Sequence, residues 1–177
     1  IPGDVELTTI DDQSQFIRNA ISDVKKDAVI GGLLAILIIF LFLRDGWSTF
    51  VISLSLPVSI VTTFFFMGQF GLSLNVMSLG GLALATGLVV DDSIVVIENI
   101  KRHLGLGEPK LDAIKAGVRE VAVAVTASTI TTVAVFLPLA LVTDITGELF
   151  RPFALTITIA LAASLFVALT IVPVLAY

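Results

Sequence analysis

The chain has 177 residues, of which 56% are hydrophobic and only 14% are charged. So few charged side chains cannot cover a folded core of this size with a water-compatible surface, which excludes an ordinary soluble domain. The absence of cysteine excludes disulfides and thiolate metal sites. The net charge of −5 does not indicate a particular partner, and nucleic acid is not expected as one.

The first predicted element is a long helix over residues 13–43. Apolar side chains recur there at helical spacing and lead into a strongly apolar run without a Gly-Pro break. A helix of that length would measure roughly 45 Å at 1.5 Å per residue, whereas the hydrocarbon core of a bilayer is roughly 30 Å thick. We therefore expect a stalk that continues into the first of several membrane spans.

Four further apolar blocks are long enough to cross a bilayer as helices, which needs about 20 residues each. Polar turns separate them, and between the third and fourth spans the segment 104–119 carries an apolar stripe that predicts a helix along the membrane surface. The expected fold class is an all-α integral membrane protein with five spans. After the first, the spans are expected at 48–68, 75–103, 120–142 and 150–177.

The placement of Lys and Arg predicts the orientation of the spans, because cytoplasmic loops are enriched in these residues. The turns at 68–75 and 142–150 contain neither residue, whereas the turn at 44–47 contains Arg44. The loop at 101–119 holds five cations, which are Lys101, Arg102, Lys110, Lys115 and Arg119. We therefore expect the turn at 44–47 and the loop at 101–119 to face the cytoplasm.

Two adjacent aspartates, Asp91 and Asp92, interrupt the third span. An aspartate at the centre of a spanning helix costs roughly 2.5–3.5 kcal/mol on insertion scales, and such residues are usually functional. Two neighbouring carboxyl groups in a low dielectric titrate as a coupled pair, so they can take up and release protons near physiological pH. The pair is therefore the predicted proton relay, with protons as the coupling ion and no other cofactor.

The cations of the chain all lie at span ends or in loops, and none lies beside the aspartates in the sequence. We therefore expect both aspartates to be mainly protonated in this chain alone, and any counter-charge to come from a segment outside it. A purely structural role in helix packing is the simpler alternative. A metal site is disfavoured because the pair has no His or Cys nearby.

Other residues around the pair suggest roles of lower specificity. Glu98 lies seven residues after Asp91 on the same helix face, so it is a candidate for extending the proton path or for meeting water and loop cations. Gly81 with Ala85, and Ala83 with Gly87, have the four-residue spacing that permits close helix packing. The fourth span is rich in hydroxyl groups, which we expect to bond back to their own helix; these belong to Thr126, Ser128, Thr129, Thr131 and Thr132.

The segment GLVVDDSIVVIENI at 87–100 resembles the aspartate-bearing helix of resistance-nodulation-division (RND) efflux permeases. Further matching segments follow in the family's order, and the resemblance covers nearly the whole chain. It is closest to the hydrophobe/amphiphile efflux branch, the multidrug pumps of Gram-negative bacteria. The other matching segments are LSLNVMSLGGLALATG at 72–87, the basic loop, FLPLAL at 136–141 and TGELFRPF at 146–153.

This resemblance implies that the chain is a fragment covering spans two to six of a permease, with residues 1–12 as the tail of a periplasmic porter domain. It implies that Asp91 and Asp92 are the proton-relay carboxylates of a drug/proton antiporter in the inner membrane. A partner lysine would lie in a second transmembrane half. The intact protein would be a homotrimer that works with a periplasmic adaptor and an outer-membrane channel.

Two other functions fit a five-span membrane domain of this kind. One is a sterol-sensing-like receptor domain, and the other is a protein-export auxiliary that also uses proton flow. The run that contains the two aspartates argues against the receptor. An enzyme is not expected, because the only histidine, His103, lies at a loop edge and no nucleophile–base pair is visible in the sequence.

Overall fold

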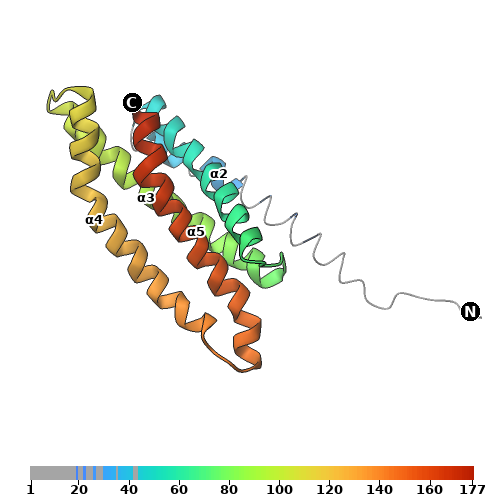
Figure 1. The fold of residues 1–177 in the computed structure, drawn as a ribbon. Coiled ribbons are helices and arrows are strands. Elements are labelled where there is room, and N and C mark those ends of the chain that lie inside the picture. The colour runs from blue at the N-terminus through green and yellow to red at the C-terminus, as the bar shows by residue number, and fades with distance from the viewer. Residues whose placement is uncertain (1–18, 20–21, 23–25, 27–29, 35, 42–43) are drawn as a thin grey trace, which may run out of the picture.

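The computed structural model describes residues 19, 22, 26, 30–34, 36–41 and 44–177. Within these ranges the chain forms four long helices, which Figure 1 shows lying side by side. The expectations for residues 1–12 and for most of the stalk lie outside the described residues. The long helices are α2 (Gly46–Gln69), α3 (Val76–Gly105), α4 (Lys110–Phe136) with a short 3₁₀ helix η1 (Leu137–Ala140), and α5 (Ile145–Ala176).

Each of the four long helices is long and apolar enough to cross a membrane, counting α4 and η1 together. A shorter apolar helix, Ile30–Leu41, falls within the predicted first span, and its bounds include residues outside the described ones. The all-α membrane fold class is therefore confirmed, with four full-length spans among the described residues.

Polar side chains cap the starts of α2, α3 and α5, where the sequence changes from turn to apolar run. Asp45 accepts a hydrogen bond from the backbone of Ser48 at the start of α2, and Asp144 accepts one from the backbone of Gly147 at the start of α5. Asn75 and Ser78 form a reciprocal capping box at the start of α3. These side chains satisfy backbone N–H groups that a helix leaves free in its first turn.

The structure differs from the sequence prediction between the third and fourth spans. A separate surface helix is expected over 104–119, but α4 begins at Lys110, directly after Pro109, and continues without a break to Phe136. The buried Ile114 and Val125 lie on the same face of this helix. No Pro interrupts residues 110–136, and the single glycine there, Gly117, packs against the backbone of Ile100, so the helix has no reason to end.

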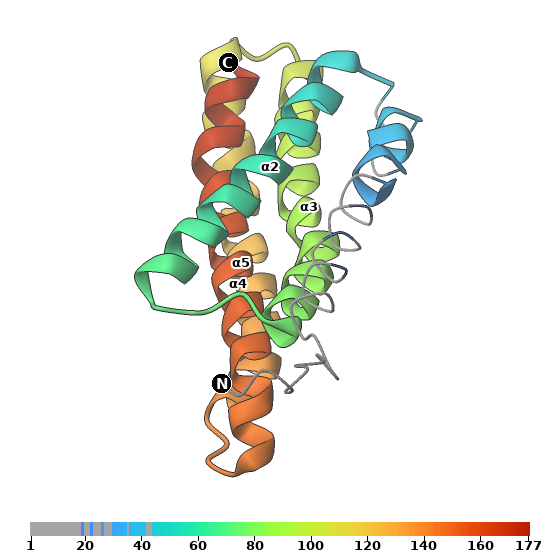
Figure 2. The ribbon, with the colours of Figure 1, turned by 90° about the vertical axis from the view of Figure 1, so that its right-hand side faces the viewer.

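Helix α5 is the centre of the arrangement, because it packs against α2, α3 and α4 and most extensively against α3. Figure 2 shows α4 and α5 running alongside one another while α2 crosses in front of them at an angle. Two hydrophobic clusters join α3 to α5. One lies around Ala85, Val89, Ile157, Ala160 and Leu161, and the other is centred on Val96, Ile97, Ile100, Val167 and Val172.

The start of α2, the turn between α3 and α4, and the end of α5 lie at one end of the bundle (Figure 1). Polar contacts join them there: Lys101 Nζ lies 3.3 Å from Asp45 Oδ2, and the Lys110 ammonium donates to the backbone carbonyl of Tyr177. The two segments that charge placement assigns to the cytoplasm therefore lie at the same end of the molecule.

Candidate functional site

The two aspartates lie near the middle of α3, where the helix is covered by neighbours on one side only. Asp91 is exposed in this structure and Asp92 is half-buried. Adjacent residues on a helix point about 100° apart, so the two carboxyl groups have different surroundings. The structure therefore places one carboxyl group against the bundle and leaves the other on its open side.

Asp92 contacts hydroxyl groups from two other helices. Its Oδ2 atom lies 3.4 Å from Thr129 Oγ1 of α4 and 3.3 Å from Ser164 Oγ of α5. Both distances are at the long end for hydrogen bonds between oxygens, so the contacts are weak ones. The carboxyl group nevertheless lies where α3, α4 and α5 meet.

The same two hydroxyl groups make shorter hydrogen bonds to backbone carbonyls. Ser164 Oγ donates to the Val89 carbonyl of α3 at 2.6 Å, and Thr129 Oγ1 donates to the Val125 carbonyl of its own helix at 2.9 Å. Both side chains are buried. Since each hydroxyl has a single proton, their oxygen lone pairs remain available to the Asp92 carboxyl group.

Sequence reasoning missed Ser164. It lies 72 residues after Asp92 in the chain and belongs to another helix, α5. The available signal is a lone serine within the apolar run LAASLFVAL. The sequence does not show which residue of α3 this serine contacts. The expectation that hydroxyls of the fourth span bond back to their own helix is confirmed for Thr129, Thr131 and Thr132. Thr129 additionally reaches Asp92.

The ion pairs among the described residues all lie at the end of the bundle that holds the α3–α4 turn. They join Lys101 to Asp45, Arg102 to Glu120, and His103 to Glu108 and Glu120. No ion pair in this part of the chain includes Asp91 or Asp92. Asp91 and Asp92 therefore differ from Asp45, Glu108 and Glu120, each of which forms an ion pair.

Glu98 lies on the exposed side of α3 and beside a groove between α3 and α4. The groove has a volume of about 320 Å³ and is lined by Val95, Glu98, Asn99, Arg102 and Val121. It begins one helical turn beyond Asp91 and Asp92 in the direction of the α3–α4 turn. The structure thus places Glu98 between the aspartates and that end of the bundle without bringing it into contact with them.

His103 belongs to a second polar cluster, which the sequence did not predict. Its Nδ1 lies 2.9 Å from Glu108 Oε1, and its Nε2 lies 2.9 Å from Glu120 Oε2. Glu120 also accepts hydrogen bonds from Asn99 and Arg102. This cluster joins the end of α3 to the start of α4, and its residues have no contact with Asp92.

Comparison with known proteins decides the family. A family model described as AcrB/AcrD/AcrF matches residues 1–177, the whole of the chain. The chain belongs to this family. This confirms the resemblance to RND multidrug efflux permeases that the aspartate-bearing segment indicates, and the family is one of transporters rather than enzymes.

Relatives within the AcrB/AcrD/AcrF family include proteins named multidrug resistance protein MdtC. The chain is 45% identical over 175 residues to those of Yersinia enterocolitica and Pectobacterium carotovorum, and 45% identical over 176 residues to that of Yersinia pestis. Each alignment covers 99% of this chain and 17% of the relative. The chain therefore spans about one sixth of the length of these relatives, and it is a multi-pass membrane segment by family and by fold.

Proposed function

We propose that this chain is the proton-translocating membrane part of a proton-driven drug and amphiphile efflux permease. Asp91 and Asp92 are its proton relay. The observation that carries the proposal is the position of Asp92 at the meeting point of three long apolar helices, in contact with one hydroxyl from α4 and one from α5.

The hydroxyl geometry suits a carboxyl group that gains and loses a proton. When Ser164 and Thr129 donate to backbone carbonyls, a protonated Asp92 can donate its O–H to either hydroxyl oxygen. When Asp92 is ionised, each hydroxyl can turn toward the carboxylate, at the expense of its carbonyl bond. Proton uptake therefore changes the hydrogen bonds that hold α4 and α5 against α3.

This change gives proton movement a way to alter helix packing. In the relay, a proton from one side of the membrane converts the carboxylate to a carboxylic acid, and its release on the other side restores the charge. The membrane potential contributes about 2.3 kcal/mol for each charge moved through 100 mV. An ionised carboxylate at this depth needs a cation, and we propose a lysine from a second transmembrane half as that partner.

Glu98 is the proposed next group on the proton path toward the α3–α4 end. Its support is the open groove that begins one turn from the aspartates and that Glu98 lines. The basic residues at this end favour a cytoplasmic location for it, so the proposed path connects the aspartates with cytoplasmic water.

The remaining parts of the proposal concern the intact protein. We infer an inner-membrane permease with periplasmic porter domains, assembled as a homotrimer with a periplasmic adaptor and an outer-membrane channel. The support is the family match and the name multidrug resistance protein that the relatives carry. The family match does not favour a sterol-sensing-like or protein-export domain.

The test is drug efflux by the intact permease with Asp91→Asn or Asp92→Asn. Asn keeps the size of the side chain but cannot exchange a proton, so each variant should lose proton-coupled efflux while reaching the membrane in normal amounts. Asp112→Asn is the matched control, because Asp112 is an exposed acid in the first turn of α4. Normal efflux by both relay variants would overturn the assignment.

A further inference from the structure

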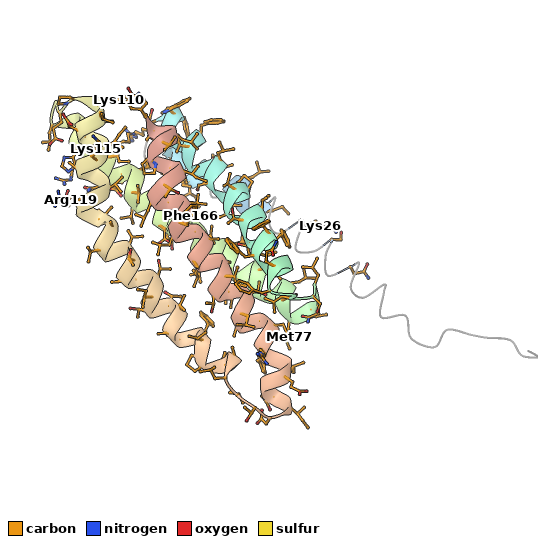
Figure 3. The ribbon with its side chains drawn as sticks, viewed as in Figure 1. Lys26, Met77, Lys110, Lys115, Arg119 and Phe166 are labelled. Carbon is orange, nitrogen blue, oxygen red and sulfur yellow. The ribbon has the colours of Figure 1, made fainter. Side chains whose placement is uncertain are left out.

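One face of α4 combines two cations with an apolar groove. Lys115 and Arg119 lie one turn apart, and five residues that follow them on the same side of the helix line a shallow, open groove along the surface of α4. Figure 3 shows the Lys115 and Arg119 side chains on the part of α4 near the α3–α4 turn. The groove is formed by Ala122, Val123, Thr126, Ala127 and Ile130.

Helix α4 is less covered by the rest of the bundle than the other long helices are. In the most apolar stretch of α4 and η1, 11% of the residues are buried, compared with 33% in α2, 44% in α3 and 50% in α5. Val123 is 78% exposed and Ile130 is 60% exposed. The apolar side chains here have no protein partner among the described residues, and a face of this kind in a membrane requires an apolar one.

The two cations are also unpartnered within the described part of the chain. The ion pairs there use Lys101, Arg102 and His103, but neither Lys115 nor Arg119. Glu120, next to Arg119, is already engaged by Asn99, Arg102 and His103.

An acidic residue, Asp112, also lies on this side of α4. It belongs to the first turn of the helix, where a carboxylate is favoured by the helix dipole. Because it is further from the groove than both cations, the positive charge lies next to the apolar surface.

The length of the groove fits one leaflet of a bilayer. Ile130 is 11 residues beyond Arg119, which corresponds to roughly 16 Å along the helix. That is about half of the roughly 30 Å hydrocarbon core. A molecule with its charge at Lys115 and Arg119 would therefore have its apolar part between the membrane surface and the middle of the bilayer.

We propose that this face of α4 binds an anionic phospholipid of the leaflet that contains the α3–α4 turn. The lipid phosphate contacts Lys115 and Arg119, and one acyl chain lies along the groove from Ala122 to Ile130. Arg offers paired N–H donors that match phosphate oxygens, and Lys adds a second positive charge. The small side chains of Ala122 and Ala127 leave the space that an acyl chain fills.

Native mass spectrometry of the intact permease, titrated with phosphatidylglycerol or with phosphatidylcholine, tests the headgroup part. The wild-type protein should retain phosphatidylglycerol in preference to phosphatidylcholine. The double variant Lys115→Gln/Arg119→Gln should bind phosphatidylglycerol about 25-fold more weakly, since each cation contributes about fivefold near an anionic surface.

The double variant Lys110→Gln/Arg151→Gln is the matched control, because it removes the same charge from positions outside this face. It should keep the wild-type preference. Equal retention of phosphatidylglycerol by the wild-type protein and by Lys115→Gln/Arg119→Gln would overturn the proposal, as would equal retention of the two lipids by the wild-type protein.

Site-directed spin labelling tests whether lipid or another protein segment covers the groove. The chain has no cysteine, so Val123→Cys provides a unique attachment point within it. In a bilayer the nitroxide at position 123 should be highly accessible to oxygen, which concentrates among acyl chains. The label at Val125→Cys should be protected, because Val125 is only 5% exposed on the same helix. Equal protection at both positions would mean that protein covers the groove, and it would overturn the proposal.

Discussion

Gly81 of α3 lies directly against the backbone of Phe153 in α5. A Cβ atom on Gly81 would come within 2.7 Å of the Phe153 carbonyl oxygen and within 3.3 Å of its Cα atom. Backbone cannot move aside as the end of a flexible side chain can, so any larger residue would push the two helices apart. The absence of a side chain at Gly81 therefore allows a close backbone approach within the most extensively packed helix pair.

We predict that Gly81→Ala destabilises the bundle. Overpacking of a tight contact costs about 1–3 kcal/mol, and here the contact lies ten residues before Asp91, nearly three turns away on the same helix. The free energy of unfolding in mixed detergent micelles should fall by that amount.

Gly80→Ala is the control, because nothing lies within 4 Å of a Cβ atom at Gly80. Alanine also favours a helix over glycine, so this variant should be at least as stable as the parent chain. A similar loss of stability in both variants would contradict the close-packing explanation.

Much of the helix layout could be predicted from the sequence, because turn residues and caps mark its boundaries. The turns near Asp45, Asn75 and Asp144 were expected, and in each a polar side chain caps the following helix. The close packing expected at Gly81 and Ala85 is confirmed, since both residues are buried. These features depend on local spacing, which a sequence displays directly. The same expectation of close packing for Ala83 and Gly87 is wrong within the described part of the chain, because both are exposed and nothing lies within 4 Å of a Cβ atom at Gly87.

The contacts between distant segments could not be predicted in the same way. Ser164 is one of many small residues in α5, and its position beside Val89 and Asp92 depends on how α5 is rotated and shifted along α3. The cluster around His103 likewise requires Glu120, 17 residues later, to lie across the helix turn. Hydropathy sets which residues enter the membrane but leaves the rotation of each helix open.

Ser164→Ala should weaken proton-coupled efflux by roughly two- to tenfold in the intact permease. The substitution removes a buried hydrogen bond to Val89, whose net value is about 0.5–1.5 kcal/mol, and a hydroxyl beside Asp92. Ser164 would then act as a positioning residue for the Asp92 carboxyl group. The measurement is the rate of drug efflux at several external pH values, and the midpoint of the pH profile should move.

Thr158→Ala serves as the comparison for Ser164, because the Thr158 hydroxyl on the same helix donates only to Ala154 of its own backbone. Its pH profile should match that of the parent protein. A reduced rate with an unmoved midpoint in Ser164→Ala would show a general packing role instead of an effect on Asp92.

Asp45 should titrate well below an ordinary aspartate. The Ser48 hydroxyl and the Ser48 backbone N–H donate to its carboxylate, and Lys101 lies beside it; together they lower the pKa of Asp45 from 3.8 to about 2. Because the folded-state pKa is depressed, the stabilisation of the α2 start is complete above pH 3.8 and is lost as the pH falls toward 2. Carbon-13 NMR of the Asp45 carboxyl group measures this midpoint directly.

Ser48→Ala should raise the pKa of Asp45 toward 3.8, since it removes the hydroxyl donor that has the largest effect. Ser53→Ala should leave the midpoint in place, because the Ser53 hydroxyl donates to the Thr49 carbonyl and does not contact Asp45. An unchanged Asp45 midpoint in Ser48→Ala would show that the cap does not control this carboxyl group.

Glu120→Gln should loosen the turn between α3 and α4. Both ring nitrogens of His103 face carboxylate oxygens, which only accept hydrogen bonds, so these contacts favour the imidazolium, which donates from both nitrogens. Glu120→Gln keeps an acceptor oxygen but leaves this cation and Arg102 without the negative charge that they share. Hydrogen–deuterium exchange of the backbone at 104–109 should become several-fold faster, while exchange in the middle of α5 stays unchanged. Asp112→Asn is the control, because Asp112 lies in the first turn of α4 and forms no ion pair with His103. This variant should leave hydrogen exchange at 104–109 as slow as in the parent protein. Equal exchange rates in Glu120→Gln and Asp112→Asn would mean that the cluster does not stabilise the turn.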